Sequence, residues 1–294
     1  MYSYKECPLC GNAHFEDKLT CVDYTVSRQE FNIVICKACH FVFTNPIPEV
    51  KDLGSYYKSE DYISHSNTNK GLIAKLYHAV RSYTLKGKLK LINQYVSRGT
   101  ILDYGCGTGM FLNTCKGAGW TTFGIEPDDG ARKLASDFGT MVYANKEDLH
   151  KNQPALKADI ITMWHVLEHV SDLHQSIDLL SGKLKPGGVL IVAVPNHKSE
   201  DAAHYGKHWA AYDVPRHLYH FDQESISRLF SKHQYELINT LPMKFDSFYV
   251  SLLSEKYQSG TGSYFKAFKT GLRSNRLAGS SGQYSSLIYV LKKK

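Results

Sequence analysis

The sequence predicts an α/β protein, built on a doubly wound, mostly parallel sheet with a small module ahead of it. Two observations support this prediction. From residue 99 onward, short apolar runs alternate with stretches of helical periodicity, which is the pattern of a parallel sheet covered by helices. Before that point, five of the seven cysteines fall within the first 39 residues, a stretch too short to bury a large core.

The composition favours a packed globular chain over a disordered one, with 43% apolar and 21% charged residues among 294. The longest strongly apolar run, residues 188–194, is far too short to cross a bilayer. The first residues lack the apolar core of a secretory signal, so we expect a cytoplasmic protein. The net charge of +7 arises entirely from residues 240–294, which carry nine basic and two acidic side chains.

Two Cys-x2-Cys pairs near the N-terminus predict a metal site whose four ligands are Cys7, Cys10, Cys36 and Cys39. Each pair places two thiolates on one side of a tight turn, and two such turns supply a tetrahedral Zn²⁺ site. Residues 18–26 and 30–35 between the pairs read as short strands, so residues 1–48 are expected to form a zinc ribbon. Four thiolates leave no open coordination position, which indicates a structural zinc ion.

Two alternatives compete with zinc. Disulfides are disfavoured in a reducing cytosol. The run Cys36-Lys-Ala-Cys39-His40 also matches the c-type haem attachment pattern, but that attachment needs export and leaves the first cysteine pair unused.

Residues 49–98 are expected to connect this module to the sheet and to cover the site. Residues 51–71 are polar and rich in tyrosine, which is typical of a loop. Residues 72–96 have apolar positions at helical spacing and predict a long amphipathic helix. We expect this helix to act as a lid, with contributions from Tyr56, Tyr57 or Tyr62.

Residues 99–294 carry the alternating pattern of the sheet. Strands are expected at residues 100–104, 121–125, 141–144, 160–164, 189–194, 235–241 and 285–291. Helices are expected at residues 110–118, 129–138, 172–184 and 223–232. Residues 258–283, rich in glycine, serine and basic side chains, are expected to form a loop.

A glycine-rich loop follows the first of these strands, with the sequence Asp103-Tyr-Gly105-Cys-Gly107-Thr-Gly109. Glycines at this position allow a sharp turn and a close approach of a ligand to the backbone. Glu126 ends the next strand, 21 residues beyond Gly105, where a carboxylate can accept hydrogen bonds from ribose hydroxyls. Carboxylates at both ends of the loop favour a cationic nucleoside over an anionic dinucleotide.

With these motifs the chain resembles the class I S-adenosylmethionine-dependent methyltransferases. The resemblance rests on the glycine loop, Glu126-Pro127-Asp128, and residues 159–165 and 184–188 in that order. It implies a Rossmann-like methyltransferase fold over residues 99–294, with S-adenosylhomocysteine as a product. It further implies that residues 105–109 wrap the methionine moiety, that Glu126 binds the ribose, and that Asp148 and Leu149 approach the adenine.

Eight of the 14 histidines fall between His165 and His220. The run His165-Val-Leu-Glu168-His169 matches the inverted zinc peptidase pattern, but its place after the fourth strand of a methyltransferase-like order argues against a peptidase. Ubiquinone-pathway O-methyltransferases carry a Glu-rich version of this segment that binds Mg²⁺. His165 stands where their first carboxylate would be, which weakens the case for a hard cation and leaves a second metal open.

The run Tyr212-Asp-Val-Pro-Arg216-His217 follows the fifth strand and resembles a run found in a bacterial methyltransferase subgroup. In this fold the position contributes to the acceptor pocket, where an arginine offers anion binding and a histidine offers a general base. A neutral histidine can take the proton of an oxygen or carbon acceptor. We expect that base to be His165, with His217 and His169 as the next candidates.

The expected function is therefore methyl transfer from S-adenosylmethionine to a small molecule, by O- or C-methylation. A four-cysteine ribbon also resembles the zinc-containing sugar C-methyltransferases, although their large extra C-terminal domain is absent here. Ribosomal RNA guanine methyltransferases are an alternative, because the basic C-terminal region would suit phosphate contacts. A third alternative is a zinc-ribbon binding module without activity, which the intact glycine motif argues against.

Overall fold

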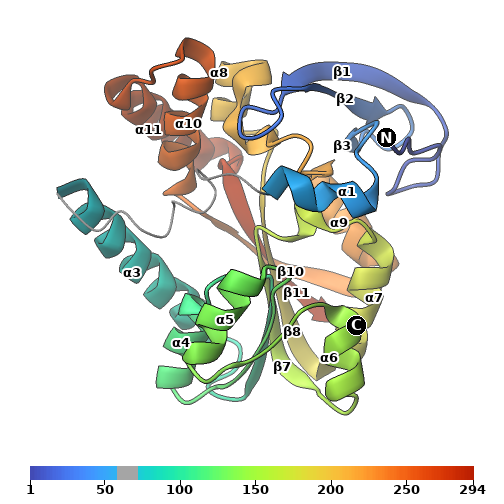
Figure 1. The fold of residues 1–294 in the computed structure, drawn as a ribbon, viewed down its shortest axis with the longest axis vertical. Helices are drawn as coiled ribbons and strands as arrows, with labels where there is room; N and C mark the ends of the chain where they lie inside the picture. The colour runs from blue at the N-terminus through green and yellow to red at the C-terminus, as the bar shows by residue number, and fades with distance from the viewer. Residues whose placement is uncertain (58–71) are drawn as a thin grey trace.

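The computed structural model describes residues 1–57 and 72–294 and contains two sheets (Figure 1). The larger sheet has seven strands in the order β10-β11-β8-β7-β4-β5-β6. Its strands are β4 (Thr100–Tyr104), β5 (Thr121–Ile125), β6 (Met141–Tyr143), β7 (Ala158–Trp164), β8 (Leu184–Pro195), β10 (Tyr235–Pro242) and β11 (Ser286–Lys293). The first five are mutually parallel, while β11 pairs antiparallel with β8 and β10 pairs antiparallel with β11.

The order of the strands explains where a ligand can bind. The chain runs outward from β4 to β5 and β6, then returns to the other side of β4 and continues through β7 and β8. Ligands of doubly wound sheets usually bind at such a reversal, at the carboxyl ends of the strands, which here are those of β4 and its neighbours. The glycine loop lies at that end of β4, as the sequence predicts.

Helices cover both faces of the large sheet (Figure 1). They are α3 (Leu72–Asn93), α4 (Met110–Gly117), α5 (Asp129–Asp137), α6 (Lys146–Asn152), α7 (Leu173–Lys183) and α9 (Gln223–Lys232). Successive strand residues alternate between the two faces, as a pleated strand requires. Leu102 and Ile161 join the core beneath α7 and α9, whereas Ile101 and Ile160 join the core beneath α3 and α4.

The smaller sheet contains the N-terminal module and one strand from the rest of the chain. Its strands are β1 (Phe15–Val22), β2 (Glu30–Cys36), β3 (Val42–Thr44) and β9 (Tyr219–His220). β1 lies three to four residues earlier than predicted, because the side chain of Asp23 accepts hydrogen bonds from the amides of Thr25, Val26 and Ser27 and forms a turn there. The pairing of β3 with β9 joins the N-terminal module to the chain after β8.

The predicted loop at residues 51–71 is partly helical. α1 (Val50–Leu53) and the 3₁₀ helix η1 (Gly54–Tyr57) precede the undescribed stretch, and Tyr62 lies outside the described residues. Further short elements follow β7 and β8: η2 (Leu167–His169), α8 (Glu200–Tyr205), η3 (Gly206–His208) and η4 (Ala210–Tyr212).

The prediction of a loop at residues 258–283 is wrong. α10 (Asp246–Ser259) is followed by α11 (Tyr264–Ser281), and the two helices pack together. Small residues form the buried side of α11, and a Cβ atom at Gly271 would lie 2.7 Å from the ring of Phe248. Glycine and serine therefore serve close helix packing here, although their abundance is also typical of loops. Within residues 1–57 and 72–294, no helix has the length and apolar character needed to cross a membrane.

Candidate functional site

The three glycines of the loop after β4 all have left-handed backbone conformations, with φ of 75° at Gly105, 54° at Gly107 and 75° at Gly109. A Cβ atom at Gly105 would lie 2.4 Å from Val166, and one at Gly109 would lie 2.6 Å from the Cβ of Ala135. A Cβ atom at Gly107 would meet nothing within 4 Å. Packing thus requires glycine at two positions, while the third faces open space in which a ligand can lie.

Glu126 lies directly against this loop. Its Oε2 accepts a hydrogen bond of 2.8 Å from the amide of Gly107, and its Oε1 accepts one of 3.0 Å from the amide of Asp128. Burial raises the pKa of Glu126, although the two amides act in the opposite direction. Each carboxylate oxygen keeps lone-pair capacity for a further donor. The predicted contact with a ribose stays a prediction.

Asp103, at the end of β4, is buried and accepts a hydrogen bond of 2.5 Å from Thr162 Oγ1. Burial raises the pKa of this carboxyl to about 7. Lys88 of α3 is the nearby cation that acts against this shift, and its Nζ lies 4.1 Å from the ring centroid of Trp164. The arrangement is a cation site between a carboxylate and an aromatic ring. No local sequence motif marks Lys88, so its place beside Asp103 was not predicted.

Asp148 and Leu149 belong to α6. The Asp148 carboxylate accepts hydrogen bonds from the amide of Ala144 at 3.2 Å and from Asn152 Nδ2 at 2.7 Å. Leu149 is fully buried in the core beneath α7. The predicted approach of these two residues to an adenine stays a prediction.

His165 follows β7 in a left-handed conformation, with φ of 56°. Its Nε2 lies 3.0 Å from Asp246 Oδ2, and its Nδ1 lies 3.5 Å from Glu168 Oε1. Burial lowers the pKa of His165, but the two carboxylates outweigh burial and raise it to about 10. The side chain is therefore an imidazolium at neutral pH and has no lone pair to accept a proton.

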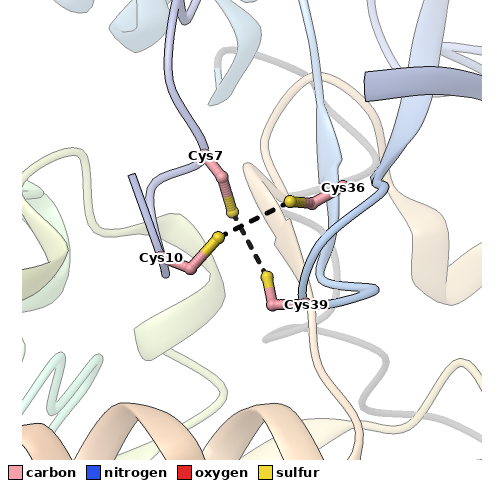
Figure 2. Close-up of side chains that lie close together, drawn as sticks. All are labelled: Cys7, Cys10, Cys36 and Cys39. Carbon is pink, nitrogen blue, oxygen red and sulfur yellow. Dashed lines mark hydrogen bonds between the residues drawn. The ribbon is translucent and has the colours of Figure 1, made fainter. Parts of the chain in front are cut away.

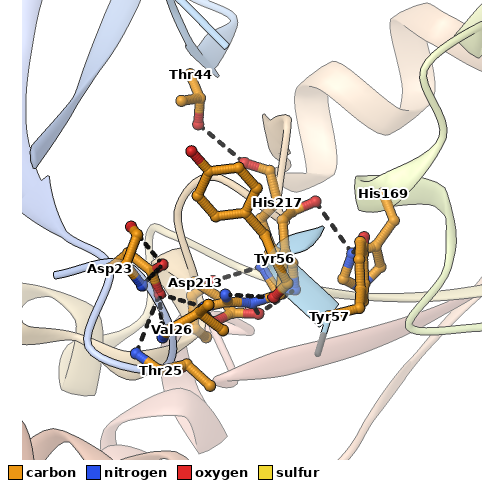
Figure 3. A network of polar contacts seen from close by, with 12 residues as sticks. Asp23, Thr25, Val26, Thr44, Tyr56, Tyr57, His169, Asp213 and His217 are labelled. Atoms are coloured by element: carbon orange, nitrogen blue, oxygen red, sulfur yellow. Dashed lines mark hydrogen bonds and ion pairs between the residues drawn. The ribbon is translucent and has the colours of Figure 1, made fainter. Parts of the chain in front are cut away.

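His169 and His217, both labelled in Figure 3, have their rings in a T-shaped contact, 4.6 Å between centroids, and both lie close to Glu168. His217 Nδ1 lies 2.8 Å from the carbonyl oxygen of Ala211, so this nitrogen carries a proton, and Nε2 lies 3.9 Å from Asp213 Oδ2. His169 Nδ1 lies 2.9 Å from the hydroxyl of Tyr57. Burial and the neighbouring His217 lower the pKa of His169 to about 4, so His169 is neutral.

Glu168 is fully buried, and neither of its carboxylate oxygens has a hydrogen-bond partner among the residues that the structure describes. Burial alone would raise its pKa, but His165 and the two other histidines hold that pKa below its usual value. A candidate metal site is formed by Glu168, His169 and His217. Each residue offers one ligand atom, and these three atoms all lie within 4.8 Å of one another. Two imidazoles and one carboxylate suit a transition metal or Zn²⁺ better than Mg²⁺.

Arg216 connects the segment of His217 to two other parts of the chain, and its partners Asp23, Tyr56 and Asp213 are labelled in Figure 3. Its guanidinium donates to both oxygens of Asp213, to Asp23 Oδ1 at 3.0 Å and to the carbonyl of Tyr56 at 3.0 Å. These contacts use four of its five N–H groups, and the side chain is 1% exposed. The expectation that Arg216 binds an anion is wrong, since Asp23, Asp213 and a carbonyl occupy its donors.

The N-terminal module also holds the backbone of His217. Thr44 of β3 donates through its hydroxyl to the carbonyl of His217 at 2.9 Å, and its amide donates to the carbonyl of Leu218 at 2.9 Å. Together with Arg216, these bonds fix the segment of His217 against the four-stranded sheet.

The four N-terminal cysteines converge as predicted (Figure 2). The sulfur atoms of Cys7 and Cys39 are 3.6 Å apart, as are those of Cys10 and Cys36, and all four are free thiols. Four sulfurs around a zinc ion at about 2.3 Å would be about 3.8 Å from one another. The cluster therefore fits a zinc ribbon.

Comparisons with known proteins agree with this fold. A family model described as a methyltransferase domain matches residues 76–240, more than half of the chain. Among solved structures, StiE O-MT aligns with a TM-score of 0.50 at 14% sequence identity, over 86% of this chain and 84% of that one. At that identity the likeness concerns the fold, and it confirms the predicted methyltransferase-like sheet.

Two curated relatives are each named ubiquinone biosynthesis O-methyltransferase. The one from Actinobacillus pleuropneumoniae serotype 5b (strain L20) is 38% identical over 106 residues, which cover 33% of this chain and 45% of the relative. The one from Rickettsia typhi is 29% identical over 153 residues, which cover 47% of this chain and 59% of the relative. The chain thus spans about half the length of these relatives.

Proposed function

The chain belongs to the methyltransferase domain family, and from this premise we propose that it transfers a methyl group from S-adenosylmethionine to a small-molecule acceptor. The observation that carries the proposal is the open space at Gly107, at the carboxyl end of β4 and next to the Glu126 carboxylate. The names of the curated relatives favour an oxygen acceptor.

The residues on the cofactor side suit a cationic nucleoside. Glu126 offers acceptor lone pairs to hydroxyl groups. S-adenosylmethionine supplies an activated methyl group on a sulfonium. The positive charge of that cofactor suits the Glu126 carboxylate beside the loop.

The residues on the acceptor side suit removal of a proton. The segment of residues 165–169 packs on the glycine loop, because the side chain of Val166 lies against Gly105. We assign the general base to the pair His169 and His217, with His217 Nε2, which lies 3.9 Å from Asp213 Oδ2, as the favoured proton acceptor. His165 is a positioning residue in this proposal, since its imidazolium is held by Asp246 and Glu168.

The cysteine cluster has a structural role in the proposed enzyme. A Zn²⁺ ion held by Cys7, Cys10, Cys36 and Cys39 would stabilise the small sheet. That sheet in turn carries Asp23 and Thr44, which hold the segment of the proposed base.

Binding of S-adenosylhomocysteine to the purified chain, measured by titration calorimetry, tests the proposal. Gly107→Arg fills the open space and should abolish binding. Gly187→Arg is the matched control, because Gly187 also has a left-handed backbone, with φ of 76°, and open space around it, but lies near the start of β8, away from the carboxyl ends of the strands. Lack of binding by the native chain, or equal loss in both variants, would contradict the proposal.

A further inference from the structure

The pair of helices α10 and α11 presents an apolar surface that the proposed site does not use. Four side chains of α11 on one side of the helix are among the most exposed large apolar residues: Tyr264 at 72%, Phe265 at 79%, Phe268 at 60% and Leu272 at 54%. Exposed apolar surface of this extent marks a contact with another molecule or with a membrane.

Basic side chains border this apolar face. α11 carries Lys266, Lys269, Arg273 and Arg276 and no acidic residue. At about 100° per residue these four form a stripe along one edge of the apolar face. Arg273 pairs with Glu200, while the other three form no ion pair with any residue in the described part of the chain.

The opposite side of α11 fixes its orientation. Ala267, Gly271, Ser274 and Ala278 are buried, and the hydroxyl of Ser274 donates to Asp201 at 2.7 Å. The helix cannot turn its aromatic side chains inward, because this small-residue side already packs against α10 and α8. The aromatic and basic side therefore faces outward.

The same surface continues toward the site. Phe245, 42% exposed, immediately precedes Asp246, whose carboxylate lies 3.0 Å from His165. The exposed ring of Tyr83 on α3 makes a T-shaped contact with Phe245, 5.7 Å between centroids. In Figure 1, α3 and α11 lie on the same side of the molecule.

We propose that the outward face of α11 docks on the surface of an anionic lipid bilayer. Aromatic and leucine side chains bordered by lysine and arginine are the composition of a helix that lies in a membrane interface. The charge argues for this occupant over a second copy of the chain, since a two-fold contact through α11 would bring two unneutralised basic stripes together. If the proposed function also holds, this docking would admit an amphiphilic acceptor from the bilayer beside Phe245.

Sedimentation of the full chain with lipid vesicles tests the docking surface without requiring methyl transfer. We expect binding to phosphatidylcholine vesicles that contain phosphatidylglycerol, weak binding to pure phosphatidylcholine, and loss of binding as salt increases. K266Q/K269Q should bind about thirtyfold more weakly, since each lysine near an anionic surface contributes about 1 kcal/mol. Y264S/F265S should also lose binding, whereas Leu134→Ser, an exposed leucine of α5 at 51%, should bind like the native chain.

Three results would overturn the docking surface. The first is equal binding to neutral and anionic vesicles, or to neither. The second is a native dimer, measured by light scattering, that Y264S/F265S converts to a monomer. The third is tighter binding of structured RNA than of anionic vesicles, with the same dependence on Lys266 and Lys269. Binding of S-adenosylhomocysteine separates these outcomes from a failure of the proposed function.

Discussion

Asp23 and Arg216 are 193 residues apart in the chain and form a buried ion pair, with 3.0 Å between Asp23 Oδ1 and Arg216 Nη2. Asp23 directly follows β1, the first strand of the small sheet, and Arg216 immediately precedes His217. The pair therefore connects the cysteine-containing module to the proposed general base.

Removal of one partner should destabilise the protein strongly. Asp23→Ala leaves the buried Arg216 with one acceptor fewer, and we expect the free energy of unfolding to fall by about 3–5 kcal/mol. Arg228→Ala, which breaks the exposed pair with Glu224, should change it by less than about 1 kcal/mol. Denaturant titration of both variants measures the difference. A loss of less than about 1 kcal/mol in Asp23→Ala would show that the buried pair is not important for stability.

The cysteine cluster should bind one zinc ion for each chain. Metal analysis of the purified protein is expected to return that ratio, and Cys7→Ser combined with Cys36→Ser should abolish it. Cys21→Ser is the matched control, because Cys21 is a buried cysteine of the same module outside the cluster. Full zinc content in the double variant would refute the assignment of the ligands.

The charge on His165 should make stability depend on pH. Its folded pKa, near 10, lies above the ordinary value of 6.5, so the stabilisation is complete below about pH 6.5 and is lost as the pH rises toward 10. The difference in unfolding free energy between the native chain and His165→Gln should therefore shrink as the pH rises through this window. His14→Gln, a change at an exposed histidine, is the control for the substitution itself. A difference that stays constant across the window would exclude a protonated His165.

Replacement by alanine should change the stability of the protein in opposite directions at two glycines of α11. Gly271→Ala adds a Cβ atom 2.7 Å from Phe248, and overpacking of this kind costs about 1–3 kcal/mol. Gly279→Ala adds one that meets nothing within 4 Å, so the better helix propensity of alanine should stabilise the protein by about 0.5–1 kcal/mol. Thermal unfolding of the two variants shows whether each substitution lowers or raises the stability of the protein. Equal effects would contradict the close packing of α10 and α11.

Local sequence patterns predicted most of the elements of the large sheet. The glycine loop, its strand and its helix follow from residues that are neighbours in the chain, since a left-handed turn and an apolar strand are local requirements. The four cysteines were equally predictable, because their spacing alone fixes two turns that can face one metal ion.

The composition of residues 258–283 misled the prediction. Glycine and serine are typical of loops, but in α11 they line the side that packs against α10. The value of a small residue at such a position depends on the neighbouring helix, which no local pattern describes.

The sequence by itself determined the doubly wound sheet, the glycine loop with Glu126 after the next strand, and the grouping of four cysteines. Each of these depends on spacing along the chain. Only the tertiary structure decided which histidines are neutral, because the charge of His165 depends on Asp246, 81 residues away. It also decided that Arg216 is a buried ion-pair partner, since Asp23 belongs to the N-terminal module, 193 residues earlier in the chain. Protonation and ion pairing depend on distances through space, and the fold alone sets those distances.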